Sequence, residues 1–178
     1  MMVNFVPVTD TNEYVFVSMF SDYAFYDLRK YSEFLTAEYK TKKAASTGAY
    51  CYINNYFCNP DKYHILLIEN EVNRFVGFCV LVDYPLVKGF YGSFFIEEFY
   101  IKEDFRGQGY GEAAVKAILR MYGTKGSLCI LDKNVPAKMF WDKMFSRYMT
   151  NIQCEEDDVS SECHKFSFIP VVKESYYG

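Results

Sequence analysis

The stretch Ser93–Tyr122, SFFIEEFYIKEDFRGQGYGEAAVKAILRMY, contains the pattern that decides the fold. Residues 94–101 are dominated by aromatic side chains and isoleucine, which predicts a largely buried strand. A charged turn and the glycine-rich segment Arg106–Gly111 follow, and they lead into a segment whose apolar residues recur at helical spacing. Gly123 stands where a glycine commonly ends a helix. The stretch therefore predicts a strand, a turn, a glycine loop and a helix in that order.

Glycines before a helix indicate an anion site. They let a ligand approach the backbone, and the first helical turn offers N–H groups and a positive dipole end to phosphate or pyrophosphate. Two familiar phosphate loops are excluded. No Lys-Ser or Lys-Thr follows at Walker spacing, and the dinucleotide fingerprint would need a third glycine where Glu112 stands. The spacing is instead Arg-x-x-Gly-x-Gly.

That spacing resembles motif A of the GNAT acetyltransferases, [Q/R]-x-x-G-x-[G/A], which holds the pyrophosphate of acetyl-coenzyme A. A second segment, NVPAKMFW at 134–141, resembles the family's N-x-x-A-x-x-F-[Y/W]. The resemblance covers roughly the second half of the chain, and the first half fits only in pattern; the alternative for RGQGYG is a plain tight turn. The resemblance implies these cofactor-binding residues: Phe99, Tyr100, Ile101, Arg106, Gly107, Gln108, Gly109, Tyr110, Gly111, Asn134 and Phe140.

The resemblance also implies the fold. We expect one α/β (α+β) domain over residues 1–178, with a mixed, mostly antiparallel sheet of six or seven strands and helices on both faces. The strands at 94–101 and 127–131 should splay apart. The pantetheine arm of acetyl-coenzyme A would enter that gap and pair with backbone groups near Phe99, Tyr100 and Ile101.

The residue pattern predicts the remaining elements. Helices are expected from Asp10 or Thr11 to about Phe20 and from about Asp27 to Lys43, whereas 47–57 fits either a helix or a loop. A helix should begin near Pro136, and 85–92 should form a loop. Aromatic residues crowd the first two helices, where they either pack the core or line an acceptor pocket. Further strands are expected at 3–9, 64–68, 74–83, 127–131, 148–154 and 164–171.

The chemistry implied by the resemblance is direct transfer of an acetyl group from the thioester to a primary amine of a small molecule or peptide. An amine of pKa ~10.4 must first lose a proton, so a base is needed. Glu97 and Glu98 are the candidates, and Glu97 is the first choice. Side chains alternate along a strand, so only one of the two should face the acceptor. Solvation or a structural ion pair is the alternative for either glutamate.

One position departs from the family pattern. Trp141 stands where many members have a tyrosine that protonates the leaving thiolate, and an indole N–H does not serve as an acid near neutral pH. Tyr148 or a water could substitute, and Trp141 is interpreted as a packing residue. This departure leaves open a second function, a non-catalytic acyl-coenzyme A-binding module. A nucleotide-binding α/β protein outside the family is a third, which the glycine spacing disfavours.

Composition narrows the protein class. A hydrophobic content of 51% with 17 Tyr and 17 Phe excludes a disordered chain, and no apolar run is long enough to span a bilayer. The six cysteines lack CxxC pairing and the start lacks a signal-peptide pattern, so we expect reduced, mostly buried thiols in a cytoplasmic protein. Two histidines without ligand spacing argue against a metal site. A net charge of −4 argues against nucleic-acid binding.

The acidic run at 155–158, with Glu162 beyond it, bears on the acceptor. The resemblance places the connection between the last two strands beside the acceptor entrance, where negative charge would attract a cationic amine. A merely solvated surface loop is the alternative. The expected partners are therefore acetyl-coenzyme A and an amine acceptor that carries positive charge, with no nucleic acid and no membrane, and a homodimer is allowed.

Overall fold

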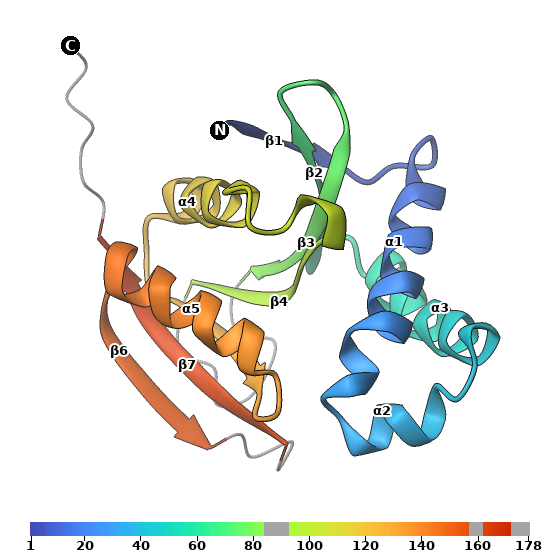
Figure 1. Cartoon of the computed structure of the whole chain (residues 1–178). Coiled ribbons are helices and arrows are strands. Elements are labelled where there is room, and N and C mark those ends of the chain that lie inside the picture. The colour runs from blue at the N-terminus through green and yellow to red at the C-terminus, as the bar shows by residue number, and fades with distance from the viewer. Residues whose placement is uncertain (84–92, 157–161, 172–178) are drawn as a thin grey trace.

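The computed structural model describes residues 1–83, 93–156 and 162–171. A seven-stranded sheet runs through it in the order β1-β2-β3-β4-β5-β7-β6 (Figure 1). Only the β4–β5 pairing is parallel, so the expected mixed, mostly antiparallel sheet is confirmed. The strands are β1 Val3–Pro7, β2 Tyr63–Asn70, β3 Phe75–Asp83, β4 Phe94–Ile101, β5 Gly126–Leu131, β6 Met149–Glu156 and β7 Cys163–Pro170.

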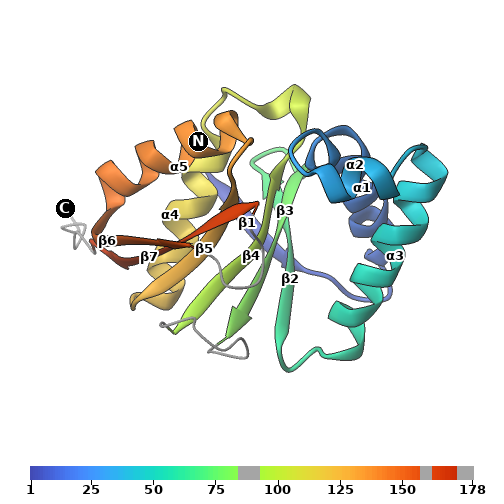
Figure 2. The same cartoon turned by 90° about the horizontal axis from the view of Figure 1, so that it is seen from below.

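Helices cover both faces of the sheet, as expected. Figure 2 shows α4 and α5 on one side and α1, α2 and α3 on the other. Each side has its own apolar core: α4 and α5 pack over residues such as Ile96 and Leu128, whereas α1 and α3 pack over residues such as Phe78 and Val80. The helices are α1 Glu13–Tyr26, α2 Glu33–Glu38, α3 Lys42–Cys58, α4 Tyr110–Tyr122 and α5 Val135–Tyr148.

The expected boundaries of the first helices are wrong. The single helix expected over 27–43 is instead a short 3-10 turn, Leu28–Lys30, followed by α2 and the start of α3. The reason is two helix caps within that stretch. The Ser32 hydroxyl accepts a hydrogen bond from the Leu35 N–H, and the Thr41 hydroxyl accepts one from the Ala44 N–H. The segment 47–57, which fitted either a helix or a loop, is helical.

The other expected strands are present with shifts of a few residues at their ends. Gly77 of β3 lies so close to β4 that a Cβ there would come within 2.1 Å of the Tyr100 carbonyl oxygen, and β2 shifts register beside it. The loop expected at 85–92 and the acidic residues Asp157 and Asp158 lie outside the described residues. The thiols are less buried than expected: Cys79 is buried, whereas Cys51, Cys58 and Cys154 are exposed.

The sheet opens between its neighbouring strands β4 and β5. β4 and β5 pair only through Phe94 with Gly126, Phe95 with Ser127 and Ile96 with Leu128. β4 continues to Ile101 and β5 to Leu131 without further pairing between them. The splay that the resemblance implied is therefore present, and the second half of β4 offers a strand edge at this opening.

A β-bulge interrupts β4 at the point where the splay begins. Glu98 pairs with Val80 and Ile96 pairs with Leu81, which leaves Glu97 as the extra residue. Ile96 and Phe99 both contribute to the core under α4 and α5, although they are three residues apart. The bulge therefore shifts the alternation of side chains, and places Glu97 and Glu98 together on the opposite face.

The two halves of the chain also meet at the open end of the sheet. The Glu162 carboxylate, just before β7, accepts hydrogen bonds from the Ser32 hydroxyl (2.6 Å) and the Glu33 N–H (2.9 Å) at the start of α2. Glu33 in turn forms an ion pair with Lys133, which follows β5 (2.6 Å). These contacts hold the C-terminal strands against the N-terminal helices.

Candidate active site

The glycine loop has the backbone conformation of an anion site. Gly107 and Gly109 have φ angles of 74° and 89°, in the left-handed region that favours glycine. A Cβ at either position would meet no atom within 4 Å, so both residues face open space. Gly109 is the N-cap of α4, whose first intrahelical bond runs from the Ala113 N–H to the Gly109 carbonyl. The N–H groups before Ala113 therefore remain outside the helical ladder.

Side chains of the loop hold its shape. Arg106 donates from its guanidinium to the Asp27 carboxylate at the end of α1 (2.6 Å) and from Nε to the Ile101 carbonyl (2.8 Å). Gln108 donates to the Asp104 carbonyl (2.7 Å). Arg106 is thus occupied in joining the loop to α1, and the groups open to a ligand belong to the backbone.

Tyr110 and Gly111 serve the packing of α4. The Tyr110 ring is buried, and Asn70 of β2 donates to its hydroxyl (3.3 Å). A Cβ at Gly111 would lie 3.1 Å from the Phe140 ring and 3.6 Å from Ile101. The contribution that either residue can make to a ligand at this loop therefore comes from its backbone N–H.

The second motif builds the start of α5. The Asn134 side chain caps this helix by accepting a hydrogen bond from the Ala137 N–H (3.1 Å). Phe140 stacks on Phe99 of β4, with centroids 5.8 Å apart. Trp141 is 6% exposed and packs edge-on against Phe99 and Phe140, so its interpretation as a packing residue is confirmed.

The expected pantetheine edge of β4 lies beside the loop. Phe99 faces α5, whereas Tyr100 lies in the core under α1 and α3. Ile101 packs toward α4, and its carbonyl already accepts from Arg106. The three residues therefore lie on the part of β4 that pairs with β3 but not with β5, and Phe99 and Ile101 share the face that carries α4 and α5.

Tyr148 is engaged between α4 and α5. Its hydroxyl donates to the Glu112 carboxylate, which also forms ion pairs with Lys143 (2.9 Å) and Arg147 (3.0 Å). These contacts, led by the Tyr148 hydrogen bond, lower the pKa of Glu112 to about 2. Two cations thus oppose the one carboxylate in the first turn of α4, where it would otherwise repel a bound anion.

Glu98 occupies the opposite face of the splay. Tyr23 of α1 donates to one of its carboxylate oxygens (2.9 Å), and Tyr56 of α3 donates to the other (3.4 Å). Desolvation, with a smaller contribution from the charge of Glu97, raises the pKa of Glu98 to about 8, although the hydrogen bonds from the two tyrosines lower it. The side chain keeps partial solvent access. A desolvated yet reachable carboxylate is the usual form of a general base.

Glu97 shares this environment because of the bulge. Burial raises the pKa of Tyr52 and Tyr56 on α3, and Glu98 and Glu97 both raise it further. The expectation that the two glutamates face opposite sides is therefore wrong. Desolvation also raises the pKa of Glu97 itself, and the positive charge of Lys62 lowers it.

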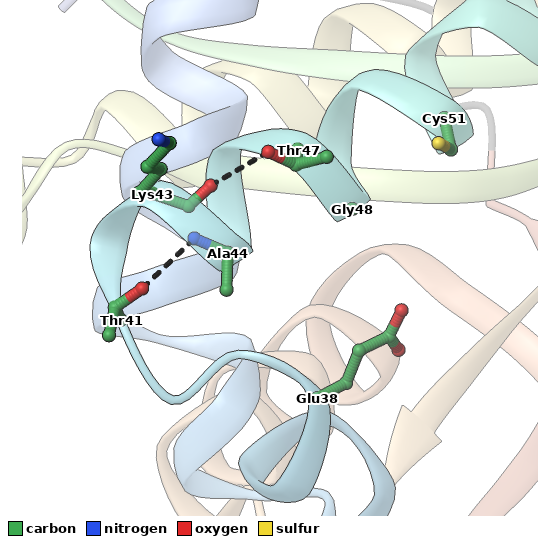
Figure 3. Close-up of a pocket in the computed structure, with 7 residues that line it drawn as sticks. All are labelled: Glu38, Thr41, Lys43, Ala44, Thr47, Gly48 and Cys51. Carbon is green, nitrogen blue, oxygen red and sulfur yellow. Dashed lines mark hydrogen bonds between the residues drawn. The ribbon is translucent and has the colours of Figure 1, made fainter.

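A separate pocket of about 490 Å³ lies between α2 and α3 (Figure 3). The Tyr39 ring covers Gly48 at this pocket, since a Cβ there would lie 2.3 Å from it. Burial raises the pKa of Tyr39 to about 12, with smaller contributions from Glu38 and Glu98 among others. The pocket contains no residue of the glycine loop; it is lined by Glu38, Thr41, Lys43, Ala44, Thr47, Gly48 and Cys51.

Comparison with protein-family models identifies the family of this chain. The model described as the acetyltransferase (GNAT) family matches residues 21–145. The chain belongs to the GNAT acetyltransferase family. The match extends well into the N-terminal half, where the sequence motifs gave no direct signal. A search of curated protein sequences gave no match.

Solved structures agree with the GNAT fold. The chain is similar to a Corynebacterium glutamicum structure described as histone acetyltransferase HPA2 and related acetyltransferase, with TM-score 0.67, 12% identity, and coverage of 98% of this chain and 100% of that one. It is also similar to Thermoplasma acidophilum PaiA N-acetyltransferase in complex with coenzyme A, with TM-score 0.57, 12% identity, and coverage of 95% and 99%. A chimera of spermidine N-acetyltransferase SpeG from Vibrio cholerae and hSSAT gives TM-score 0.57, 10% identity, and coverage of 96% of each chain.

GNAT proteins use acetyl-coenzyme A, and the loop fits its pyrophosphate. The fit rests on the two open left-handed glycines, the N–H groups at the start of α4 and the unpaired edge of β4. Among the described residues, no group of three or more His, Cys, Asp or Glu side chains could hold a metal ion. No helix in the described ranges is both long and apolar enough to traverse a bilayer.

Sequence reasoning missed three features of this GNAT site. Tyr23 was only one of many aromatic residues in the first helices, and Tyr56 was not singled out. Both become visible as partners of Glu98 only across 75 and 42 residues of sequence. The third feature is the partner of Arg106, Asp27, which is 79 residues away. No short-range pattern marks such pairs, although the spacing of Tyr52 and Tyr56 by one helical turn was available once 47–57 was read as a helix.

Proposed function

We propose that this GNAT protein transfers an acetyl group directly from acetyl-coenzyme A to a primary amine of a small molecule or peptide, with Glu98 as the base. The observation that carries the proposal is the position of the Glu98 carboxylate. It lies at the bulge where β4 leaves β5, desolvated and held by two hydroxyls, on the same strand that leads into the glycine loop. The cofactor loop and the base are thus two ends of one continuous segment.

Different groups of the chain would bind acetyl-coenzyme A and accept the proton from the amine. The backbone N–H groups of the Arg106–Gly111 loop would bind the pyrophosphate, and the edge of β4 would pair with the pantetheine amides. Glu98 takes one proton from the ammonium, and the freed lone pair attacks the thioester carbon. The new C–N bond places negative charge on the former carbonyl oxygen, and the C–S bond breaks as the C=O bond forms again. The second amine proton leaves to the thiolate or to solvent, so that one amide, one thiol and one net proton result.

The bulge supports this chemistry at the oxyanion. A bulged residue leaves its backbone groups outside the regular ladder, and Glu97 is that residue in β4. We infer that its N–H is positioned to stabilise negative charge on the thioester oxygen. Glu97, the first choice for the base from sequence, then contributes chiefly through its backbone and its charge.

A second candidate function is a non-catalytic acyl-coenzyme A-binding module. It is favoured by the absence of an obvious acid for the leaving thiolate among the residues that the structure describes. Trp141 is buried among Phe99 and Phe140, and the Tyr148 hydroxyl is committed to Glu112. A coenzyme A thiol is a moderately weak acid, so release as the thiolate followed by protonation from water keeps transfer feasible.

The acceptor is proposed to be cationic. Burial raises the pKa of Tyr52, and three carboxylates, those of Glu98, Glu38 and Glu97, raise it further. These carboxylates come from α2 and β4, so negative potential converges on the face between α2, α3 and β4. Such a face attracts a positively charged amine and slows a negatively charged one. The acidic run at 155–158 adds to this reasoning as a prediction from sequence.

Release of free coenzyme A thiol in the presence of an amine panel tests the proposal. The panel should include peptides, polyamines and aminoglycosides, together with neutral and anionic amines of similar size. We expect turnover with at least one cationic amine and a kcat/KM that declines as ionic strength rises past about 0.1 M. Binding of acetyl-coenzyme A without turnover on any amine would favour the binding module instead. A best acceptor with net negative charge would contradict the cationic preference.

A further inference from the structure

We propose that Tyr23 and Tyr56 are positioning residues that hold the Glu98 carboxylate, one hydroxyl on each oxygen, and thereby favour its ionised, proton-accepting form. This inference rests on the proposed role of Glu98 as the base. Tyr23 lies on α1 and donates to Oε2 at 2.9 Å, whereas Tyr56 lies on α3 and donates to Oε1 at 3.4 Å. Two helices from separate parts of the chain thus each donate one hydrogen bond to the carboxylate.

Both phenols are fixed by packing. The Phe20 ring lies 5.8 Å from the Tyr23 ring and 6.2 Å from the Tyr56 ring, so one buried side chain contacts both. Tyr23 also packs against Tyr100, and Tyr56 packs against Tyr63. Because these rings interlock, the two hydroxyls remain directed at Glu98 without a further loss of side-chain entropy.

The phenols can only act as donors here. Burial raises the pKa of Tyr23 well above its ordinary value, and the charge of Glu98 raises it further; the same two causes raise the pKa of Tyr56. Both hydroxyls therefore keep their protons at neutral pH and donate to the carboxylate. A carboxylate that accepts two hydrogen bonds is stabilised relative to the neutral acid, which opposes the effect of desolvation.

Among the other ionisable groups near Glu98, Glu97 shifts its pKa in the direction opposite to the two tyrosines. Glu97 on the same strand raises the pKa of Glu98 through like charge. The phenols of Tyr39 and Tyr52, which respond to the charge of Glu98, come from the end of α2 and from α3. The two hydrogen bonds thus increase the ionised fraction of Glu98 at a given pH, while each oxygen retains a lone pair for the incoming ammonium.

The test measures the pH dependence of Tyr23→Phe and Tyr56→Phe. In kcat/KM, we expect the acidic limb to move to higher pH by roughly half to one unit for Tyr23→Phe and by less for the longer Tyr56 contact. At high pH, where Glu98 is ionised in every form, kcat/KM should return to the level of the unmodified protein. A purely structural role would lower the high-pH plateau and leave in place both the midpoint of the rate profile and the midpoint of the Glu98 titration, which would overturn the proposal.

Tyr63→Phe is the matched control. Its ring packs 4.8 Å from Tyr56, but its hydroxyl accepts a hydrogen bond from Asn55, whereas the hydroxyls of Tyr23 and Tyr56 donate to Glu98. The variant should keep the midpoint of the unmodified protein, and an equal shift would overturn the assignment. Thermal unfolding of all three variants separates loss of fold from loss of the hydrogen bond.

A direct titration separates this inference from the proposed function. Carboxyl ¹³C NMR of labelled glutamate, with the Glu98 signal assigned by Glu98→Gln, reports the midpoint in the absence of any substrate. An upward shift in Tyr23→Phe supports the positioning role even if no amine is acetylated. An unchanged Glu98 titration in both tyrosine variants overturns it, whatever the protein's activity. A shifted NMR midpoint with an unshifted rate profile supports positioning and removes Glu98 from the role of base.

Discussion

The proposed cofactor loop and the cluster around Glu98 lie at two ends of the same strand, yet backbone groups form one and side chains form the other. The loop is built from backbone: two left-handed glycines and the N–H groups at the start of α4. The Glu98 cluster is built from side chains that three separate elements, α1, α3 and β4, bring together. A backbone site leaves its pattern in consecutive residues, whereas a side-chain site depends on the complete fold.

This contrast predicts that cofactor binding and the choice of acceptor depend on different parts of this chain. The loop needs glycine at positions 107 and 109, and Arg106 joins it to Asp27 at the end of α1. The proposed acceptor face depends on residues such as Tyr23 and Glu38, which lie outside the loop. The following experiments therefore ask whether the two regions fail independently.

The largest expected effect is on the acceptor side. Glu98→Gln should lower kcat/KM for the best amine by roughly 10²-fold or more, because it removes the proposed base and keeps the shape of the side chain. Acetyl-coenzyme A affinity, measured by calorimetry, should stay within about twofold. Glu97→Gln is the matched comparison, with the same change one residue away. A larger loss for Glu97→Gln would return the role of base to Glu97, and full activity in both would leave only a water chain.

On the cofactor side, Gly109→Val should weaken acetyl-coenzyme A binding by about tenfold or more. The side chain would stand in the open space before α4, at a φ of 89° that a β-branched residue resists. Gly123→Val is the control, because Gly123 has a φ of 62° at the other end of the same helix and also faces open space. Both variants should lose comparable stability, and only Gly109→Val should lose the cofactor. Affinity within twofold in a folded Gly109→Val protein would contradict the loop assignment.

The raised pKa of Glu98 also predicts a pH-dependent stability. The folded pKa of about 8 exceeds the ordinary value of 4.5, so the native state holds this proton more tightly than the unfolded chain does. The unfolding free energy should therefore fall as pH rises from about 4.5 to about 8. Over that window Glu98→Gln should gain on the unmodified protein by on the order of 1–2 kcal/mol, reduced from the full shift by solvent access. Urea unfolding at several pH values measures this, and a difference that does not change with pH would contradict the desolvated state of Glu98.

Asn134→Ala should have the smallest effect, and on stability more than on binding. Its side-chain oxygen caps α5, so its removal should cost about 1 kcal/mol of unfolding free energy. Acetyl-coenzyme A affinity should change by less than about fivefold, because at most one side-chain contact is lost. Asn134→Asp or Asn134→Ser, both good caps, should restore most of the stability. A binding loss much greater than the stability loss would give this residue a direct role in holding the cofactor.

The cofactor half of the molecule was predictable because its signals are local. The order of β4, loop and α4, the helix at Pro136 and the splay of the sheet followed from two motifs and the resemblance they carry. The structure added that Arg106 and Asn134 are engaged within the protein and that Gly111 accommodates Phe140. Such contacts depend on which elements pack together, so the motif spacing alone did not reveal them.

The acceptor half was less predictable for two physical reasons. Ser32 and Thr41 are helix caps within a stretch whose composition otherwise suits one long helix, so the boundaries were misplaced. The bulge at Glu97 follows from packing on both faces of β4, and alternation within a single strand cannot reveal an extra residue. Once the bulge is known, the shared environment of Glu97 and Glu98 follows directly.

The short seam between β4 and β5 has a mechanical consequence. Three residue pairs between β4 and β5 join strands β1–β4 to strands β5–β7. At the open end of the sheet, the hydrogen bonds from the start of α2 to Glu162 form a second connection. Between these two connections the sheet should deform more easily. Amides on the edge of β4 that does not pair with β5 should therefore exchange with solvent early. A molecule that lies in the opening and bonds to that edge takes the place of the missing strand ladder. The protein would then be most rigid with the ligand bound, and its free energy of unfolding would rise with ligand concentration.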